Sequence, residues 1–66
     1  MKYYLTFGQQ SPLKNGWIEI ESISYEKARI LAFDVFGRYW SMLYVEEQFE
    51  KEHFPSGKIG ETLRGE

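Results

Sequence analysis

Apolar and polar residues alternate in two segments near the N-terminus, and this alternation predicts two β-strands. The first segment runs from Lys2 to Phe7 and the second from Gly16 to Ser22. The residues between them are rich in turn formers, including the pair Asn15-Gly16, and they are too many for a tight hairpin turn. We therefore expect two antiparallel strands joined by a loop that is long enough to wrap a ligand.

A helical repeat replaces the alternation in the middle of the chain. Ser24 is a suitable N-cap and Gly37 a suitable residue after the last turn, so the pattern predicts a helix from Tyr25 to Phe36. Apolar residues spaced at i, i+3, i+4, i+7 and i+8 form one stripe that should face the sheet. Its members are Ala28, Leu31, Ala32, Val35 and Phe36.

The remaining pattern predicts a third strand, from Trp40 to Val45, and a short second helix from Glu46 to Phe54 that Pro55 ends. A right-handed crossover through the main helix gives strand order 2-1-3. The expected fold is α+β with element order ββαβα, a three-stranded antiparallel sheet covered by one main helix. Residues 1–59 form this single domain, and the polar, Gly-rich residues 60–66 are expected to be a flexible tail.

Two apolar surfaces remain uncovered in this arrangement. Ile30 and Phe33 lie on the side of the helix opposite the sheet-facing stripe, either as tolerated surface hydrophobes or as a subunit interface. So short a chain buries little of its surface, so we expect a homo-oligomer in which this pair forms the contact. The second face of the sheet carries Tyr4 and Trp17, which need a subunit, a ligand or the second helix as cover.

Composition favours binding over catalysis. Aromatic residues make up 18% of the 66 residues, while cysteine is absent and His53 is the single histidine. Aromatic side chains bring large contact area at low entropic cost. A formal net charge of −2 argues against binding to long nucleic acid, which needs a broad basic surface. No apolar stretch predicts a membrane span or a signal peptide, so we expect a cytosolic protein.

Candidate catalytic and metal sites are weak. Glu52 and His53 are neighbours on a predicted helix and point about 100° apart, which does not suit an acid–base pair. The glutamates between Glu46 and Glu52 are interleaved with Lys51, which is typical of a solvated face rather than a calcium loop. We therefore expect no enzyme activity, no metal and no cofactor.

The order of motifs resembles a widespread family of very small bacteriophage proteins. The likeness extends from the first strand to Lys58. The motifs that carry it are Tyr3-Tyr4-Leu5-Thr6-Phe7-Gly8-Gln9, Gly16-Trp17-Ile18-Glu19-Ile20-Glu21, Ser24-Tyr25-Glu26-Lys27-Ala28-Arg29 with Phe33 and Phe36-Gly37, Trp40-Ser41 with Tyr44 and Glu46-Glu47, and Phe54-Pro55-Ser56-Gly57.

The resemblance implies an immune-evasion protein similar to anti-CBASS nucleotide sponges. Such proteins assemble into small homo-oligomers and sequester cyclic nucleotide signals of bacterial defence. For this chain it implies a homo-oligomer, expected to be a tetramer, in the cytoplasm of the infected bacterial host. It does not indicate which nucleotide is bound.

A sponge needs aromatic surfaces for bases and arginines or backbone N–H groups for phosphates. Each candidate aromatic also fits core or interface, and each arginine also fits a weak surface ion pair. The candidate stacking residues are Phe7, Trp40 and Tyr44, the candidate phosphate partners are Arg29 and Arg38, and the candidate polar contacts are Thr6, Gly8 and Gln9.

A second hypothesis belongs to another functional class. A small phage inhibitor would bind a host defence protein, such as a nuclease or a CRISPR effector, through its acidic and aromatic surface. The segment from Glu46 to Glu52 has the negative charge to imitate nucleic acid, although Lys51 dilutes it.

Overall fold

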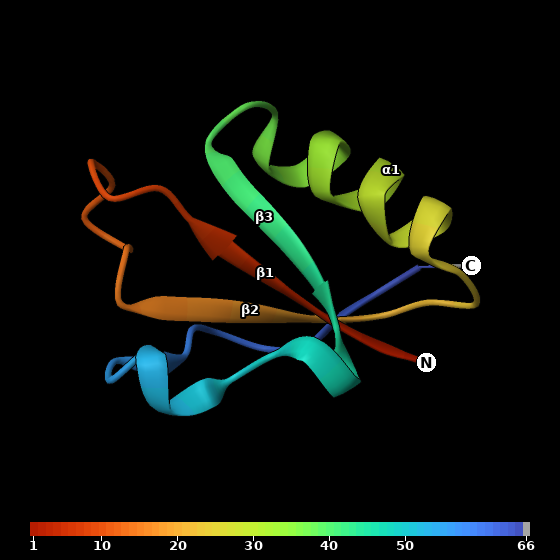
Figure 1. Cartoon of the computed structure of the whole chain (residues 1–66). Coiled ribbons are helices and arrows are strands. Elements are labelled where there is room, and N and C mark those ends of the chain that lie inside the picture. Colours follow the sequence, from red (N-terminus) through yellow and green to blue (C-terminus); the bar gives the residue numbers. More distant parts are fainter. Residues whose placement is uncertain (66) are drawn as a thin grey trace.

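The computed structural model describes residues 1–65 and shows a small α+β fold with one main helix and a mixed sheet (Figure 1). The main helix lies on one side of the sheet, and the chain after the third strand crosses the other side (Figure 1). In chain order the elements are β1 (Lys2–Phe7), β2 (Gly16–Glu21), α1 (Tyr25–Phe36), β3 (Trp40–Val45), the 3₁₀ turns η1 (Glu46–Gln48) and η2 (Lys51–His53), β4 (Gly57–Lys58) and β5 (Leu63–Arg64).

The central strand of the sheet is β1, which runs antiparallel to both β2 and β3. Leu5 lies opposite Ile18 on one side and opposite Leu43 on the other. Two further short strands, β4 and β5, lie along the outer side of β2 and run parallel to it. The prediction of three antiparallel strands in the order 2-1-3 is therefore corrected to a mixed sheet, β3-β1-β2-β4, with β5 also paired to β2.

The sequence pattern did not predict the two short strands, and the reason is physical. Each has two residues, too few to show an alternation, and the glycines Gly57 and Gly60 have positive φ angles of 73° and 64°, which are typical of turns. Within the predicted flexible tail, residues 60–66, the chain instead forms β5, and the N–H of Gly65 donates to the carbonyl of Glu21 at 3.0 Å. Glu66 lies outside the described residues.

The main helix begins and ends where the sequence predicts. Ser24 caps its first turn with a side-chain hydrogen bond, and Ala28 and Ala32 are fully buried against the sheet. Their small side chains let the helix approach closely. Val35 was expected in this stripe but is 48% exposed, and Phe36 is the residue that closes the core at this end of the helix.

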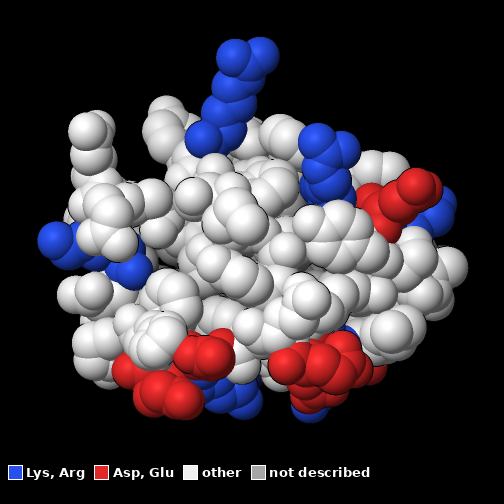
Figure 2. All heavy atoms as spheres, in the orientation of Figure 1, with Lys and Arg blue, Asp and Glu red and all other residues white. Residues whose placement is uncertain are grey.

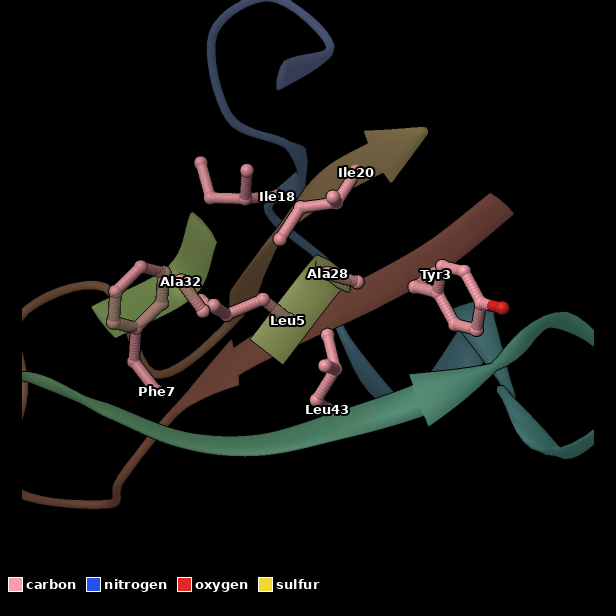
Figure 3. Close-up of a cluster of buried hydrophobic side chains, with 8 residues drawn as sticks. All are labelled: Tyr3, Leu5, Phe7, Ile18, Ile20, Ala28, Ala32 and Leu43. Atoms are coloured by element: carbon pink, nitrogen blue, oxygen red, sulfur yellow. The ribbon is translucent and has the colours of Figure 1, made fainter. Parts of the chain in front are cut away.

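The hydrophobic core lies between α1 and the facing side of the sheet (Figure 3). All three long strands contribute large side chains, and the helix contributes two alanines. Burying such side chains stabilises the fold by about 1.5–3 kcal/mol each. The core residues are Tyr3, Leu5, Phe7, Ile18, Ile20, Ala28, Ala32 and Leu43.

The predicted helix from Glu46 to Phe54 is wrong. The segment consists of η1 and η2, separated by Phe49 and Glu50 in extended conformations. The ring of Phe49 stacks on that of Tyr4 with 4.7 Å between centroids, and this anchor draws the backbone down onto the sheet. A regular helix would be stabilised by weak side-chain pairs at its surface, which contribute less than this contact.

Candidate functional site

A cleft lies between two connections at one end of the sheet. One wall is the loop between β1 and β2, and the other is the turn between α1 and β3. It is widely open to solvent, and its volume of about 550 Å³ is within the usual range of small-molecule sites. The residues that line it are Gly8, Gln10, Ser11, Pro12, Arg38, Tyr39, Trp40 and Ser41.

The first wall is a succession of backbone turns rather than an open loop. The N–H of Ser11 donates to the carbonyl of Gly8 at 2.9 Å, and the N–H of Lys14 donates to the carbonyl of Ser11 at 3.2 Å. A third turn closes with Gly16 N–H donating to the Leu13 carbonyl at 3.0 Å. These bonds fold the turn-rich sequence into a defined wall, as its Pro, Asn and Gly content favours.

The second wall begins where α1 ends. Gly37 has a φ of 60°, and its N–H donates to the carbonyl of Phe33 at 2.8 Å, an arrangement common at helix C-termini. The N–H of Tyr39 then donates to the carbonyl of Phe36 at 3.0 Å. The reversal carries Arg38 and the two residues after it to the mouth of the cleft.

An irregularity in the β1–β3 pairing sets the position of Trp40. Thr6 pairs with Met42 but Phe7 pairs with Trp40, so Ser41 is an extra residue in β3. Such a bulge re-aims the side chains beside it. The indole of Trp40 accordingly packs against the core and lies edge-on to Phe33 at 5.1 Å.

The cleft combines one cation with an exposed aromatic ring. Arg38 is the only charged residue in its lining, and within residues 1–65 it forms no ion pair. Tyr39 is 84% exposed, which leaves its ring free to stack. The indole N–H of Trp40 is buried and has no hydrogen-bond partner in the described part of the chain. An unpaired donor of this kind costs about 1–3 kcal/mol.

The structure brings three of the eight predicted ligand residues to the cleft, namely Gly8, Arg38 and Trp40. Thr6 and Phe7 are buried, and the Phe7 ring packs edge-on to Phe36 in the core.

The other three also lie outside the cleft lining. Gln9 is exposed beside it. The guanidinium of Arg29, on α1, lies 5.1 Å from the centre of the Phe33 ring. Tyr44 is half-buried on the opposite face of the sheet, 5.6 Å from Phe49.

Five lining residues were missing from the prediction: Gln10, Ser11, Pro12, Tyr39 and Ser41. The loop was expected to be long enough to wrap a ligand, but the alternation could not identify which of its residues face inward. Tyr39 had a usable signal, because it stands between two predicted site residues, Arg38 and Trp40, directly after the helix stop.

The opposite face of the sheet holds an aromatic cluster that has a structural role. Phe49 contacts Tyr4, Trp17 and Phe54 at centroid distances of 4.7, 5.6 and 5.3 Å, and the ammonium of Lys51 lies 5.3 Å above Tyr4. Burial, followed by the charge of a nearby glutamate, raises the pKa of Tyr4 to about 12. The segment after β3 covers part of this face through Phe49 and Phe54, in place of the predicted second helix.

The predicted interface pair, Ile30 and Phe33, is exposed, but its two members border different features. Phe33 is 44% exposed beside Trp40 of β3. Ile30 is 63% exposed and lines a shallow hollow with Leu31 and Gly65. The two residues are one turn apart on α1, and their role as a subunit contact stays a prediction.

Residues 1–65 were searched for metal-binding clusters and for helices that could cross a membrane. They contain no group of three or more His, Cys, Asp or Glu side chains placed to hold a metal ion, and no helix with the length and apolarity to cross a membrane. His53 pairs with Glu50 at 3.1 Å, and both side chains are exposed.

Comparisons with known proteins returned no match: no family model, no curated protein and no solved structure matches this chain.

Proposed function

We propose that this chain is a phage immune-evasion protein that binds a cyclic nucleotide signal of bacterial defence and holds it without cleaving it. The proposal places it in the cytoplasm of the infected bacterium. The observation that supports it most is the cleft of about 550 Å³ in which Arg38, Tyr39 and Trp40 meet the β1–β2 loop. These are the side-chain types that recognise a phosphate and a base.

Each part of a nucleotide has a matching group in the cleft. A base can stack on the exposed ring of Tyr39, which contributes about 1–3 kcal/mol for each stacked base. A phosphate can accept two parallel N–H bonds from the guanidinium of Arg38. Gln10 and Ser11 add polar contacts along the opposite wall.

The chemistry of the lining favours holding over cleaving. Among the described residues, its lining includes no histidine, carboxylate, lysine or cysteine, the side chains most often used as catalytic acids, bases or nucleophiles. General acid–base catalysis works best with a group whose pKa lies near the working pH. Sequestration lowers the free signal concentration in proportion to the number of sites.

Calorimetry against cyclic dinucleotides, cyclic trinucleotides and cyclic ADP-ribose-like signals tests the proposal. We expect one class to bind, and Arg38→Ala to weaken it about ten- to one-hundred-fold, since a charge-assisted hydrogen bond contributes about 1.5–3 kcal/mol. Arg38→Lys restores the charge but not the two-pronged geometry, so it should recover only part of the affinity.

Arg29→Ala is the matched control, because Arg29 lies on α1 outside the cleft lining. An equal loss with Arg29→Ala would contradict the site, and loss of nucleotide beyond one equivalent per site would contradict sequestration. Bound nucleotide should be recovered intact after heat denaturation.

The second candidate function, inhibition of a host defence protein, has one observation in its favour. Residues Glu46, Glu47, Glu50 and Glu52 are all exposed, and in Figure 2 acidic side chains gather along the lower side of the molecule. Such a surface can imitate nucleic acid toward a nuclease. No heat with any nucleotide, together with one host protein bound at fixed stoichiometry, would transfer the proposal to this candidate.

A further inference from the structure

The outer edge of β3 is unpaired within residues 1–65, since β3 is the end strand of the sheet and pairs only with β1. It has six residues, Trp40–Val45, and none is charged or proline. Edge strands of stable monomers usually carry a Lys, a Pro or another device that prevents pairing. One carbonyl of β3, that of Leu43, accepts a hydrogen bond from the Tyr25 hydroxyl at 3.2 Å, but a backbone carbonyl has two lone pairs. The edge therefore keeps hydrogen-bonding capacity for one more strand.

Apolar side chains border this edge on both faces of the sheet. On the helix side, Phe33 is 44% exposed beside Trp40, and Tyr25 is 41% exposed while its hydroxyl donates to the carbonyl of Leu43 at 3.2 Å. On the other side, Met42 is 50% exposed. A strand added here would cover all of them in part.

The charges next to β3 indicate which strand fits. Arg38 lies just before the strand, and Glu46 and Glu47 follow it directly. Figure 1 shows β3 running from the turn after α1 down to this acidic segment. Pairing with an identical strand in parallel would bring like charges together at both ends. Antiparallel pairing brings Arg38 of each copy to the two glutamates of the other.

We propose that β3 pairs antiparallel with β3 of a second copy of this chain, across a two-fold axis near the middle of the strand. The two sheets then form one continuous sheet, and the axis is perpendicular to it, so both copies of α1 lie on the same side. The side of α1 that carries Tyr25 and Phe33 faces its counterpart across the axis. The interface is isologous, as in most homodimers.

This proposal does not depend on the nucleotide site, although Arg38 belongs to both. A guanidinium donates hydrogen bonds from two sides. If a carboxylate of the second copy binds one side of Arg38, the other side stays free for a phosphate. The second copy would then orient Arg38 in the cleft. Self-association and nucleotide binding are measured separately, so either can fail alone.

A charge exchange tests the pairing by sedimentation velocity between about 1 and about 100 µM protein. Glu47→Arg alone, and Arg38→Glu alone, should each raise the dimer dissociation constant about tenfold, because each creates two like-charge contacts. An equimolar mixture of the two variants should restore the dimer, because both contacts become attractive again. A misfolded variant could not give this restoration.

Two single substitutions separate this edge from the rest of the surface. Met42→Lys places a charge at the edge and should give a folded monomer, whereas Ile30→Lys, outside the β3 edge, should leave the dimer unchanged. The proposal is overturned by a monomer in the unmutated protein across the range, by a mixture that stays monomeric, or by a dimer that only Ile30→Lys disrupts.

Discussion

The two edges of the sheet differ in how the rest of the chain covers them. Along β2, the C-terminal residues add two short strands, and Lys58 and Arg64 within them form ion pairs with Glu19 and Glu21 at 3.5 and 3.2 Å. Along β3, the described residues add no further strand, and the strand itself carries no charge. One edge is closed by paired strands, whereas the other is contacted at the Leu43 carbonyl by the Tyr25 hydroxyl and has no strand beside it.

The C-terminal third of the chain is responsible for this difference between the two edges. Residues after β3 first cross the open face of the sheet, where Phe49 covers Tyr4 and Trp17, and then close the β2 edge. Short strands with charged residues are a common means of preventing edge-to-edge association. The protection at β2 directs any association through strand pairing to β3.

Two phenylalanines, one on the covered sheet face and one beside the β3 edge, should differ clearly in their contribution to stability. Phe49 lies at the centre of the aromatic cluster on the covered side, so Phe49→Ala should lower the free energy of unfolding by about 3 kcal/mol. Phe33 borders the open β3 edge and is 44% exposed, so Phe33→Ala should cost about 1 kcal/mol or less. Urea denaturation at low protein concentration measures both, and equal losses would contradict the distinction.

The next effect concerns two glycines. A Cβ added at Gly16 in β2 would overlap the Ile59 side chain and lie 3.2 Å from the carbonyl oxygen of Gly57. Gly16→Ala should therefore force the Ile59 side chain to re-orient and the Gly57 backbone to shift slightly. We expect a loss of about 1–3 kcal/mol, as for other overpacked sites. Gly8→Ala is the matched control, because its Cβ would meet Ser41 at an ordinary 4.0 Å. Thermal unfolding that ranks Gly8→Ala as the more damaging change would show that the β2 edge is not tightly closed.

The sequence predicted the parts of the fold that repeat with a clear period. The boundaries of β1, α1 and β3 were correct because alternation, an N-cap at Ser24 and a stop at Gly37 fix them locally. The two-residue strands β4 and β5 carry no period of their own. They form because β2 presents backbone groups to them, and that information lies far away in the sequence.

The candidate site was predictable to a smaller extent, for the same reason. Gly8, Arg38 and Trp40 lie in the cleft lining because they stand at the ends of predicted elements that meet in space. Phe7 was expected to stack on a ligand and lies in the core, since chemistry alone does not separate a core aromatic from a stacking surface. Its burial to 5% exposure depends on the helix that covers it.

The β2 edge should also give the fold a weak dependence of stability on pH. Glu19 accepts a hydrogen bond from the hydroxyl of Thr62, which is the main cause that lowers the pKa of this carboxyl, and the ammonium groups of Lys2 and Lys58 lower it further. The pKa of Glu19 is lower in the folded than in the unfolded chain, so its ionised carboxylate stabilises the fold at pH values above the unfolded pKa. This stabilisation is lost as the pH falls through the folded pKa. The loss should therefore begin below about pH 4.5.

Thr62→Val removes the hydroxyl at nearly constant volume and isolates this contribution. Unfolding free energies measured between pH 7 and about pH 3 should show a loss of about 1 kcal/mol at neutral pH and a shallower fall toward acid. Glu21→Gln, on the same edge but in a more exposed ion pair, should change the neutral value less. Because β3 contains no Asp or Glu, the strand at the open edge contributes no carboxylate to the dependence of stability on pH in this range. A Thr62→Val profile parallel to that of the unmutated protein would place the acid sensitivity elsewhere and weaken the contrast between the two edges.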